Sequence, residues 1–92
     1  MHFDLTDLRL LLAIADAGSL SKAAERFPIA LSAASNRLRG FEDDCGIVVF
    51  TRSAGGMTPT PAGRFVLERA ARVVSEADQL RDTVRELRGP QR

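Results

Sequence analysis

Near the start of the chain, apolar residues recur with the period of an α-helix on two nearly opposite sides. They predict a helix from about Leu5 to Ala17, with its N-cap at Asp4 or Thr6 and its end at Gly18. A helix that is apolar on two sides needs two neighbours, which here are the domain core and either a later helix or a second subunit. One apolar stripe consists of Leu5, Leu8, Leu12 and Ala15, and the other of Leu10, Ile14 and Ala17.

Two further amphipathic segments predict two closely joined helices. Ser19 can cap the first, and Pro28 ends it. The second is expected to begin near Ala30 or Leu31 and to last until Gly46. The first carries Leu20, Ala23, Ala24 and Phe27 on its apolar side; the second turns Ala34, Leu38, Phe41 and Cys45 inward and Ser32, Ser35, Asn36, Arg39 and Asp43 outward. Such a pair is typical of a helix-turn-helix, although plain αα-hairpins share the pattern.

The period then changes from that of a helix to that of a strand. The run from Ile47 to Phe50 is β-prone, the segment from Ser53 to Gly56 is a flexible turn, and Met57 with Thr58 can return as a second strand before Pro59. A hairpin directly after a helix-turn-helix predicts a wing, whose small tip suits contact with a phosphate backbone. The alternative is an ordinary surface hairpin.

Thr60 and Pro61 predict the start of a long helix, because they supply an N-cap followed by proline at the first helical position. The helix is expected to end at about Arg88. Its apolar residues alternate four and three apart, which is the heptad pattern of a dimerising helix; they are Val66, Ala70, Val73, Ala77, Leu80, Val84 and Leu87. Expected charge pairs on its exposed side are Glu68 with Arg72, Arg72 with Glu76, and Asp82 with Arg85. A monomeric helix folded back on its own core is the alternative.

Composition limits the classes of function. The 92 residues suffice for one small core, and 13 Lys and Arg against 12 Asp and Glu leave a net charge of +1, so any binding of nucleic acid must depend on where the charges lie. The longest apolar run, Leu10 to Ala15, is too short for a membrane span, which favours a soluble, cytoplasmic protein. Cys45 is expected to be a small buried hydrophobe, and His2 is the only histidine. These residues argue against an enzyme, a metal site or a cofactor.

The order of these parts resembles the amino-terminal module of LysR-type transcriptional regulators over nearly the whole chain. The residues that carry the resemblance are Leu8 and Arg9, the runs 18–27 and 37–39, Ser35, Phe41, Glu42, Gly46, Phe50, Arg52 and the run 58–63. The resemblance implies a mainly α fold, a winged helix-turn-helix of three helices and a two-stranded wing, followed by a long dimerisation helix. The expected division is residues 1–60 for DNA binding, 61–88 for the linker or dimerisation helix, and 89–92 for a linker or the end of a fragment.

The resemblance also implies a homodimer, possibly a tetramer in the full-length protein, on an interrupted inverted repeat of double-stranded DNA. The outward face of the third helix makes Asn36 the best candidate for a bidentate contact to adenine, and the resemblance favours a backbone contact for Arg37. For Lys22, Arg37 and Arg39 the alternative is a solvated surface cation. The expected DNA-binding residues are Ser19, Ser21, Lys22, Leu31, Ser32, Ala33, Ser35, Asn36, Arg37, Arg39, Arg52, Ser53 and Gly55. The expected dimerisation residues are the seven heptad positions together with Leu10 and Ile14. Asp43 and Asp44 are expected to face away from the duplex.

Several positions depart from the family pattern where DNA would be read. Leu31 and Ser32 stand where the family commonly has Gln and Pro, Asn36 stands where it usually has Arg, and Gly55 stands where Arg is frequent. These departures, with the near-neutral charge, leave a second hypothesis open, a winged-helix dimerising adaptor without operator recognition. The molybdate-regulator type of amino-terminal domain shares the layout. A small-molecule effector is expected only through a carboxy-terminal domain that this chain lacks.

Overall fold

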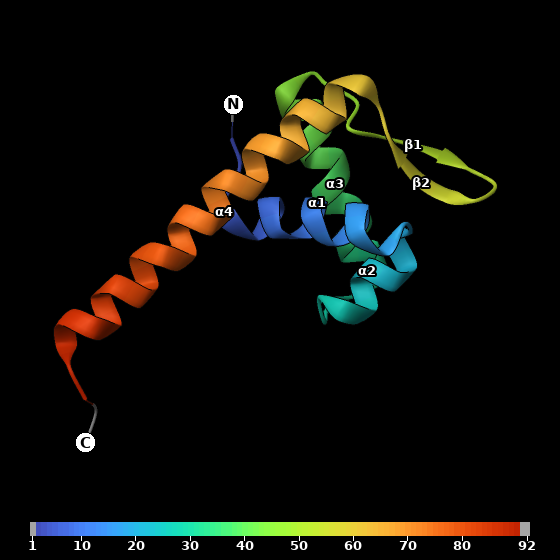
Figure 1. The fold of residues 1–92 in the computed structure, drawn as a ribbon. Helices are drawn as coiled ribbons and strands as arrows, with labels where there is room; N and C mark the ends of the chain where they lie inside the picture. The colour runs from blue at the N-terminus through green and yellow to red at the C-terminus, as the bar shows by residue number, and fades with distance from the viewer. Residues whose placement is uncertain (1, 91–92) are drawn as a thin grey trace.

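The computed structural model describes residues 2–90, which form four helices and one two-stranded antiparallel sheet (Figure 1). The elements are α1 (Leu5–Ala17), α2 (Leu20–Arg26), α3 (Leu31–Cys45), β1 (Phe50–Ser53), β2 (Gly56–Pro59) and α4 (Pro61–Arg88). The predicted mainly α winged helix-turn-helix with a long final helix is confirmed. The hairpin and the C-terminal end of α4 lie at opposite ends of a molecule that measures 50 × 25 × 20 Å. Gln91 and Arg92, expected in the final linker, lie outside the described residues.

The helix boundaries follow the local capping residues. Asp4, rather than Thr6, is the N-cap of α1: its side chain accepts a hydrogen bond from the main-chain N–H of Asp7, and the Asp7 side chain accepts one from the N–H of Asp4. Gly18 ends α1 in the left-handed conformation, with φ of 78°. Thr60 caps α4 through the N–H of Gly63. The predicted ends of the helices are therefore confirmed to within a residue.

The core is built around α1, which contacts all three other helices. Leu10, Leu11 and Ile14 are at most 1% exposed. Leu11 belongs to neither predicted stripe, whereas Leu5 is 40% exposed. The prediction that Leu10 and Ile14 contribute to a dimer interface is wrong, because the protein's own helices already cover both side chains.

The first strand begins later than predicted. Ile47 and Val48 are exposed and outside the sheet, and β1 pairs with β2 from Phe50 to Ser53. The Glu42 carboxylate explains the shift, since it accepts hydrogen bonds from the main-chain N–H groups of Val49 and Phe50 at 2.7 and 3.2 Å. Those amides therefore bond to α3 rather than to a neighbouring strand at the point where the chain turns into the wing.

The long helix α4 packs on the domain with its first half and projects from it with its second half (Figure 1). At 28 residues it is roughly 42 Å long. Ala70 is only 3% exposed, so it belongs to the core and not to a free dimerisation face, whereas Leu80 and Leu87 are 65% and 83% exposed. Within residues 2–90, no helix has both the length and the hydropathy to cross a membrane.

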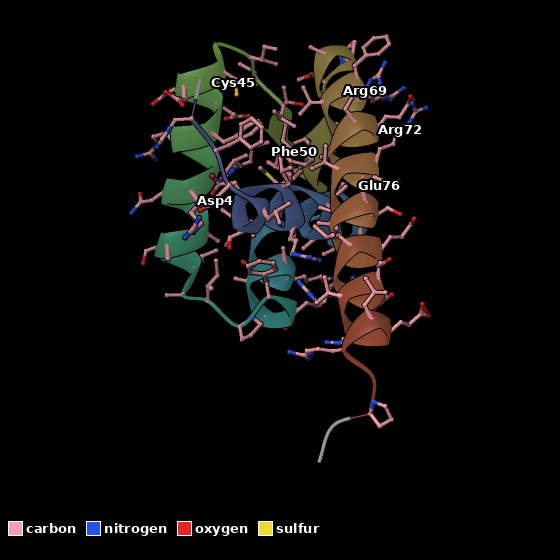
Figure 2. The ribbon with its side chains drawn as sticks, turned by 90° about the vertical axis from the view of Figure 1, so that its left-hand side faces the viewer. Asp4, Cys45, Phe50, Arg69, Arg72 and Glu76 are labelled. Atoms are coloured by element: carbon pink, nitrogen blue, oxygen red, sulfur yellow. The ribbon has the colours of Figure 1, made fainter. Side chains whose placement is uncertain are left out.

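Two of the three predicted charge pairs on α4 are present. Arg72 lies 3.3 Å from Glu68, and Arg85 lies 3.9 Å from Asp82. In the part of the chain that the structure describes, no ion pair joins Arg72 to Glu76, although both project from the side of α4 that faces away from α3 (Figure 2). These exposed pairs add little to stability, so the apolar positions decide what α4 contacts.

Candidate nucleic-acid interface

A groove lined by both serine hydroxyls and apolar side chains lies between α2, the start of α3 and the wing. Its volume is about 500 Å³, and five serines lie along it. The lining residues are Ser19, Leu20, Ser21, Leu31, Ser32, Ser35, Arg52, Ser53, Ala54, Gly56 and Met57. The structure therefore brings seven of the thirteen predicted DNA-binding residues to one concave surface. Hydroxyl groups that both donate and accept hydrogen bonds suit contact with phosphate oxygens and base edges.

The N-terminal turn of α2 forms one wall of the groove. The Ser19 hydroxyl oxygen caps this helix by accepting a hydrogen bond of 3.1 Å from the N–H of Lys22. Ser21 and Lys22 are exposed on the same turn. Ser19 therefore has a structural role in holding this turn, while Ser21 and Lys22 keep their side chains free toward solvent.

Leu31, Ser32 and Ser35 on the outward face of α3 form the floor of the groove. Leu31 is 49% exposed, Ser32 is exposed and Ser35 is half-buried. Ala33 and Asn36 are also exposed on α3, but they are not among the residues that line the groove. Within residues 2–90, no hydrogen bond involves the Asn36 side chain. An exposed amide with neither donor nor acceptor used is available for a bidentate contact.

The wing forms the opposite wall and is fixed to the turn between α1 and α2. Gly56 has φ of 122°, and a Cβ there would lie 2.2 Å from the carbonyl oxygen of Gly18. Only glycine permits this close approach. The contact sets where Arg52 and Ser53 stand relative to α3.

A second depression, of about 180 Å³, lies between α3 and the wing and has two arginine side chains in its lining. Arg39 of α3 and Arg52 of β1 both line it, together with Ser35. Among the described residues neither arginine forms an ion pair. Glu42 also lines this depression, but its carboxylate is engaged by the two amides that precede and begin β1. Two unpaired guanidinium groups on adjacent elements form a suitable site for a phosphate.

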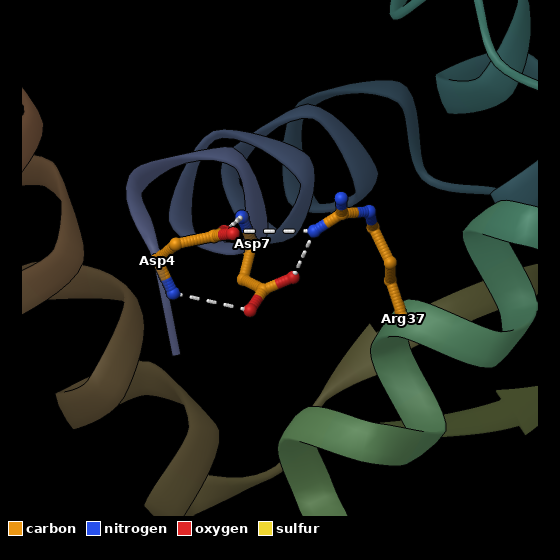
Figure 3. A network of polar contacts seen from close by, with 3 residues as sticks. All are labelled: Asp4, Asp7 and Arg37. Carbon is orange, nitrogen blue, oxygen red and sulfur yellow. Dashed lines mark hydrogen bonds and ion pairs between the residues drawn. The ribbon is translucent and has the colours of Figure 1, made fainter. Parts of the chain in front are cut away.

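Arg37 lies away from both hollows. Its guanidinium donates a hydrogen bond of 2.7 Å to Asp7 and lies 3.5 Å from Asp4, so it ties α3 to the start of α1 (Figure 3). The hydrogen bond to Asp7 raises the pKa of Arg37. The pKa of Asp4 is lowered, mainly by the main-chain N–H of Asp7 and further by Arg37. The observed partners of Arg37 are acidic side chains of its own chain, a pairing that the sequence pattern did not indicate.

The far end of α3 carries negative charge. Asp43 and Asp44 are exposed there, and neither lines the groove or the smaller depression. Asp44 accepts a hydrogen bond from the main-chain N–H of His2. These two carboxylates are thus separated from the hydroxyl-bearing end of α3.

An apolar groove of about 340 Å³ lies on another side of the molecule, between the end of α3 and the first half of α4. Phe65, 76% exposed, is part of it and was not among the predicted interface residues. The signal that could have identified it is its position beside Val66 of the heptad stripe. Cys45, near the end of α3 (Figure 2), also lines this groove, is half-buried, and has a pKa raised mainly by burial. It is therefore less completely buried than predicted.

The sequence model for bacterial regulatory helix-turn-helix proteins of the lysR family matches residues 5–64, which include α1, α2, α3 and the wing. The chain belongs to the lysR family. The resemblance inferred from the sequence motifs is thereby confirmed. Proteins of this family regulate transcription, which is a DNA-binding and not a catalytic role.

Curated relatives of this lysR-family chain are bacterial regulators. It is 43% identical over 88 residues to the small neutral protease regulatory protein of Streptomyces coelicolor, covering 96% of this chain and 26% of that protein. It is 35% identical over 94 residues to the transcriptional regulator CbbR of Xanthobacter flavus, covering 99% of this chain and 27% of CbbR. The chain therefore spans about a quarter of the length of the curated relatives that it matches.

Solved structures with the same fold include DNA complexes of lysR-type domains. The BenM DNA-binding domain with catB site 1 DNA superposes with a TM-score of 0.91 at 26% identity, covering 97% of this chain and all of that one (100%). The CbnR DNA-binding domain bound to DNA gives a TM-score of 0.85 at 29% identity, covering 92% and 98%. These matches confirm the winged-helix fold with its long C-terminal helix.

Proposed function

We propose that this chain is the DNA-binding and dimerising part of a transcriptional regulator and that it reads double-stranded DNA as a dimer, or a dimer of dimers, on an interrupted inverted repeat. The observation that carries this proposal is the exposed polar face of α3, part of which lines a groove flanked by the wing and by α2. The DNA complexes of the two similar domains support it.

The proposed base contacts come from the first two turns of α3. Asn36 is exposed and unpaired among the described residues, so its amide can accept from and donate to the major-groove edge of adenine. Ser32 and Ser35 lie on the same face, and their short hydroxyl side chains can form hydrogen bonds that discriminate less between bases. Leu31 and Ala33 supply apolar surface that suits contact with a thymine methyl group.

The proposed backbone contacts surround this face. Arg39 and Arg52 face one depression between α3 and the wing, where a phosphate can bridge them. Ser21 lies on the α2 wall of the groove, with Lys22 exposed on the same turn, and Ser53 and Gly55 lie at the end of the wing. With a net charge of only +1, this local clustering has to supply the electrostatic attraction that the whole chain lacks.

The proposed dimer forms through α4. Val73, Leu80, Val84 and Leu87 leave exposed apolar surface on this helix, of which the last three lie on the projecting half. An antiparallel pairing of two α4 helices lays the projecting half of each over the apolar groove beside Phe65 in the partner. It therefore covers the exposed apolar residues of the projecting half and the apolar groove together. In this proposal residues 1–60 bind DNA and residues 61–88 dimerise. Two copies of α3 then meet half-sites about one helical turn, or a multiple of it, apart.

The adaptor without operator recognition remains the second candidate, because Leu31, Asn36 and Gly55 depart from the family pattern and the net charge is small. A titration with fluorescent duplex DNA at several salt concentrations separates the two. A sequence-specific DNA-binding protein loses affinity steeply as the salt concentration rises: the logarithm of its binding constant falls against the logarithm of salt with a slope of about −0.9 for each phosphate contact. It also binds duplexes selected for tight binding better than scrambled duplexes of the same composition. No measurable complex, or equal affinity for both duplexes at every salt concentration, would refute operator recognition.

The proposed regulator acts in the cytoplasm and senses an effector only through a further domain.

A further inference from the structure

Two attachments, far apart along α4, hold this helix to the rest of the protein. At its start, the Thr60 hydroxyl donates to the main-chain oxygen of Val48, and Gly63 approaches Val49 so closely that a Cβ would lie 2.0 Å from its carbonyl oxygen. Further along, Asp78 accepts a hydrogen bond of 2.8 Å from Arg9 of α1. The two attachments are about 22 Å apart along the helix axis.

The Arg9–Asp78 pair is distinctive in its position. Among residues 2–90 it is the only ion pair that joins α4 to another element. It is also the outermost attachment, because every residue from Gln79 to Arg88 is exposed. The side chains are 31% and 46% exposed, so the pair is partly shielded from water by the packed helices. Arg81 lies 3.9 Å from the same carboxylate and keeps it in a positive environment.

The contacts between the two attachments are apolar, chiefly through Val66, Ala70 and Val74. Apolar contacts are not directional and tolerate a small rotation of one helix on another, whereas a guanidinium–carboxylate hydrogen bond loses strength when its geometry changes. The start of α4 therefore acts as the fixed point, and the ion pair selects one angle of the helix about it.

We propose that Arg9 and Asp78 are positioning residues that set the angle between α4 and α1, and thereby the half-site separation that the dimer accepts on DNA. The inference rests on the proposed function, because the separation matters only if two copies of α3 read one duplex. The shared α4 pair lies near the two-fold axis, so a rotation at the ion pair moves α3 relative to that axis. One added base pair shifts a half-site by about 3.4 Å and rotates it by about 35°.

The first experiment measures binding of the 92-residue chain to inverted repeats whose central spacer varies one base pair at a time. Asp78→Asn removes the charge while keeping the shape of the side chain. The matched control is Asp82→Asn, which removes a carboxylate from the exposed Arg85 pair on the same helix without touching α1. We expect the ratio of affinities between the preferred and the neighbouring spacing to fall about threefold in Asp78→Asn, and to keep its original value in the control. An unchanged ratio in Asp78→Asn overturns the proposal.

The second experiment tests the angle without DNA. Spin labels at Glu25→Cys and Glu86→Cys, in a Cys45→Ala background, report the distance between the body of the domain and the end of α4. Dilution with unlabelled protein restricts the signal to distances within one chain. We expect a broader distance distribution in Asp78→Asn than in Asp82→Asn. Equal widths overturn the positioning role. If the original protein prefers no spacing because it binds no duplex, the proposed function fails, and the distance measurement still decides the role of the pair.

Discussion

The main-chain N–H of Met57 donates a hydrogen bond of 2.9 Å to the carbonyl oxygen of Gly18. This bond joins the wing to the turn between α1 and α2, and the neighbouring Gly56 approaches the same oxygen without a side chain between them. The position of the wing is therefore set by a backbone contact with the body of the domain, and only indirectly by the hairpin itself.

Replacement of Gly56 by alanine should displace the wing. A Cβ would meet the Gly18 oxygen at 2.2 Å, and a φ of 122° strains any residue other than glycine. We expect a loss of about 1–3 kcal/mol in the free energy of unfolding, with weaker DNA binding on all sequences alike. Gly55→Ala is the matched control for stability, because nothing lies within 4 Å of its added Cβ. Thermal unfolding of the two variants and duplex titration of Gly56→Ala check this, and equal stability of both variants would contradict the role given to the contact.

Asn36 and Arg52 should differ in how their loss affects binding. Asn36→Ala removes an amide from the face of α3, and we expect the preference for the correct base pair to weaken by about 1–3 kcal/mol at one position. Arg52→Ala removes a cation beside the wing, and we expect lower affinity for every sequence and a salt slope reduced by about 1 per subunit. Competition binding with single-base variants of one duplex measures both effects. Equal, sequence-independent losses would show that Asn36 reads no base.

The helices could be predicted from the sequence because their ends depend on neighbouring residues. Asp4, Ser19 and Thr60 cap helices through bonds to amides three residues ahead, and such bonds need no knowledge of the fold. The start of β1 could not be predicted in this way. It depends on Glu42, which reaches amides seven and eight residues later across the end of α3.

The surfaces were predicted less completely than the elements. Helical periodicity identifies apolar faces, but it does not say whether the same chain or a second one covers them. The pattern therefore predicts an interface at Leu10 and Ile14, although both are core residues. Ion pairs between helices are equally hard to predict from the sequence. The partners of Arg37, Asp4 and Asp7, become its neighbours only when α1 crosses α3. The hydroxyl-bearing face of α3 was predictable because it is contained in a single helix.

Acid should weaken the N-cap of α1 and, to a smaller extent, the tie between α1 and α3. The pKa of Asp4 is lowered in the folded protein, first by the N–H of Asp7, so its stabilising contribution is present above the unfolded pKa of about 3.8 and is lost as the pH falls through the folded value. We expect Asp4→Asn to lower the melting temperature at pH 6 and to bring it closer to that of the original chain as the pH falls below about 4. Asp43→Asn, whose carboxylate has no partner among the described residues, is the control. A constant gap between Asp4→Asn and the original chain from pH 6 to pH 2 would argue against this linkage.

Dimerisation should depend on the projecting half of α4. Leu80 is 65% exposed in the single chain, so Leu80→Glu removes little from the core, but it places a charge where the proposed partner packs. Burial of a leucine side chain contributes about 1.5–3 kcal/mol, and a two-fold interface contains it twice, so we expect the dimer dissociation constant to rise at least about tenfold. The matched control is Thr83→Glu, which adds the same charge at an exposed position outside the heptad stripe. Sedimentation equilibrium measures association, and circular dichroism checks that each variant is folded. If Leu80→Glu associates as strongly as Thr83→Glu, the two chains meet through another surface, and the half-site spacing must then be set by that surface instead of by α4.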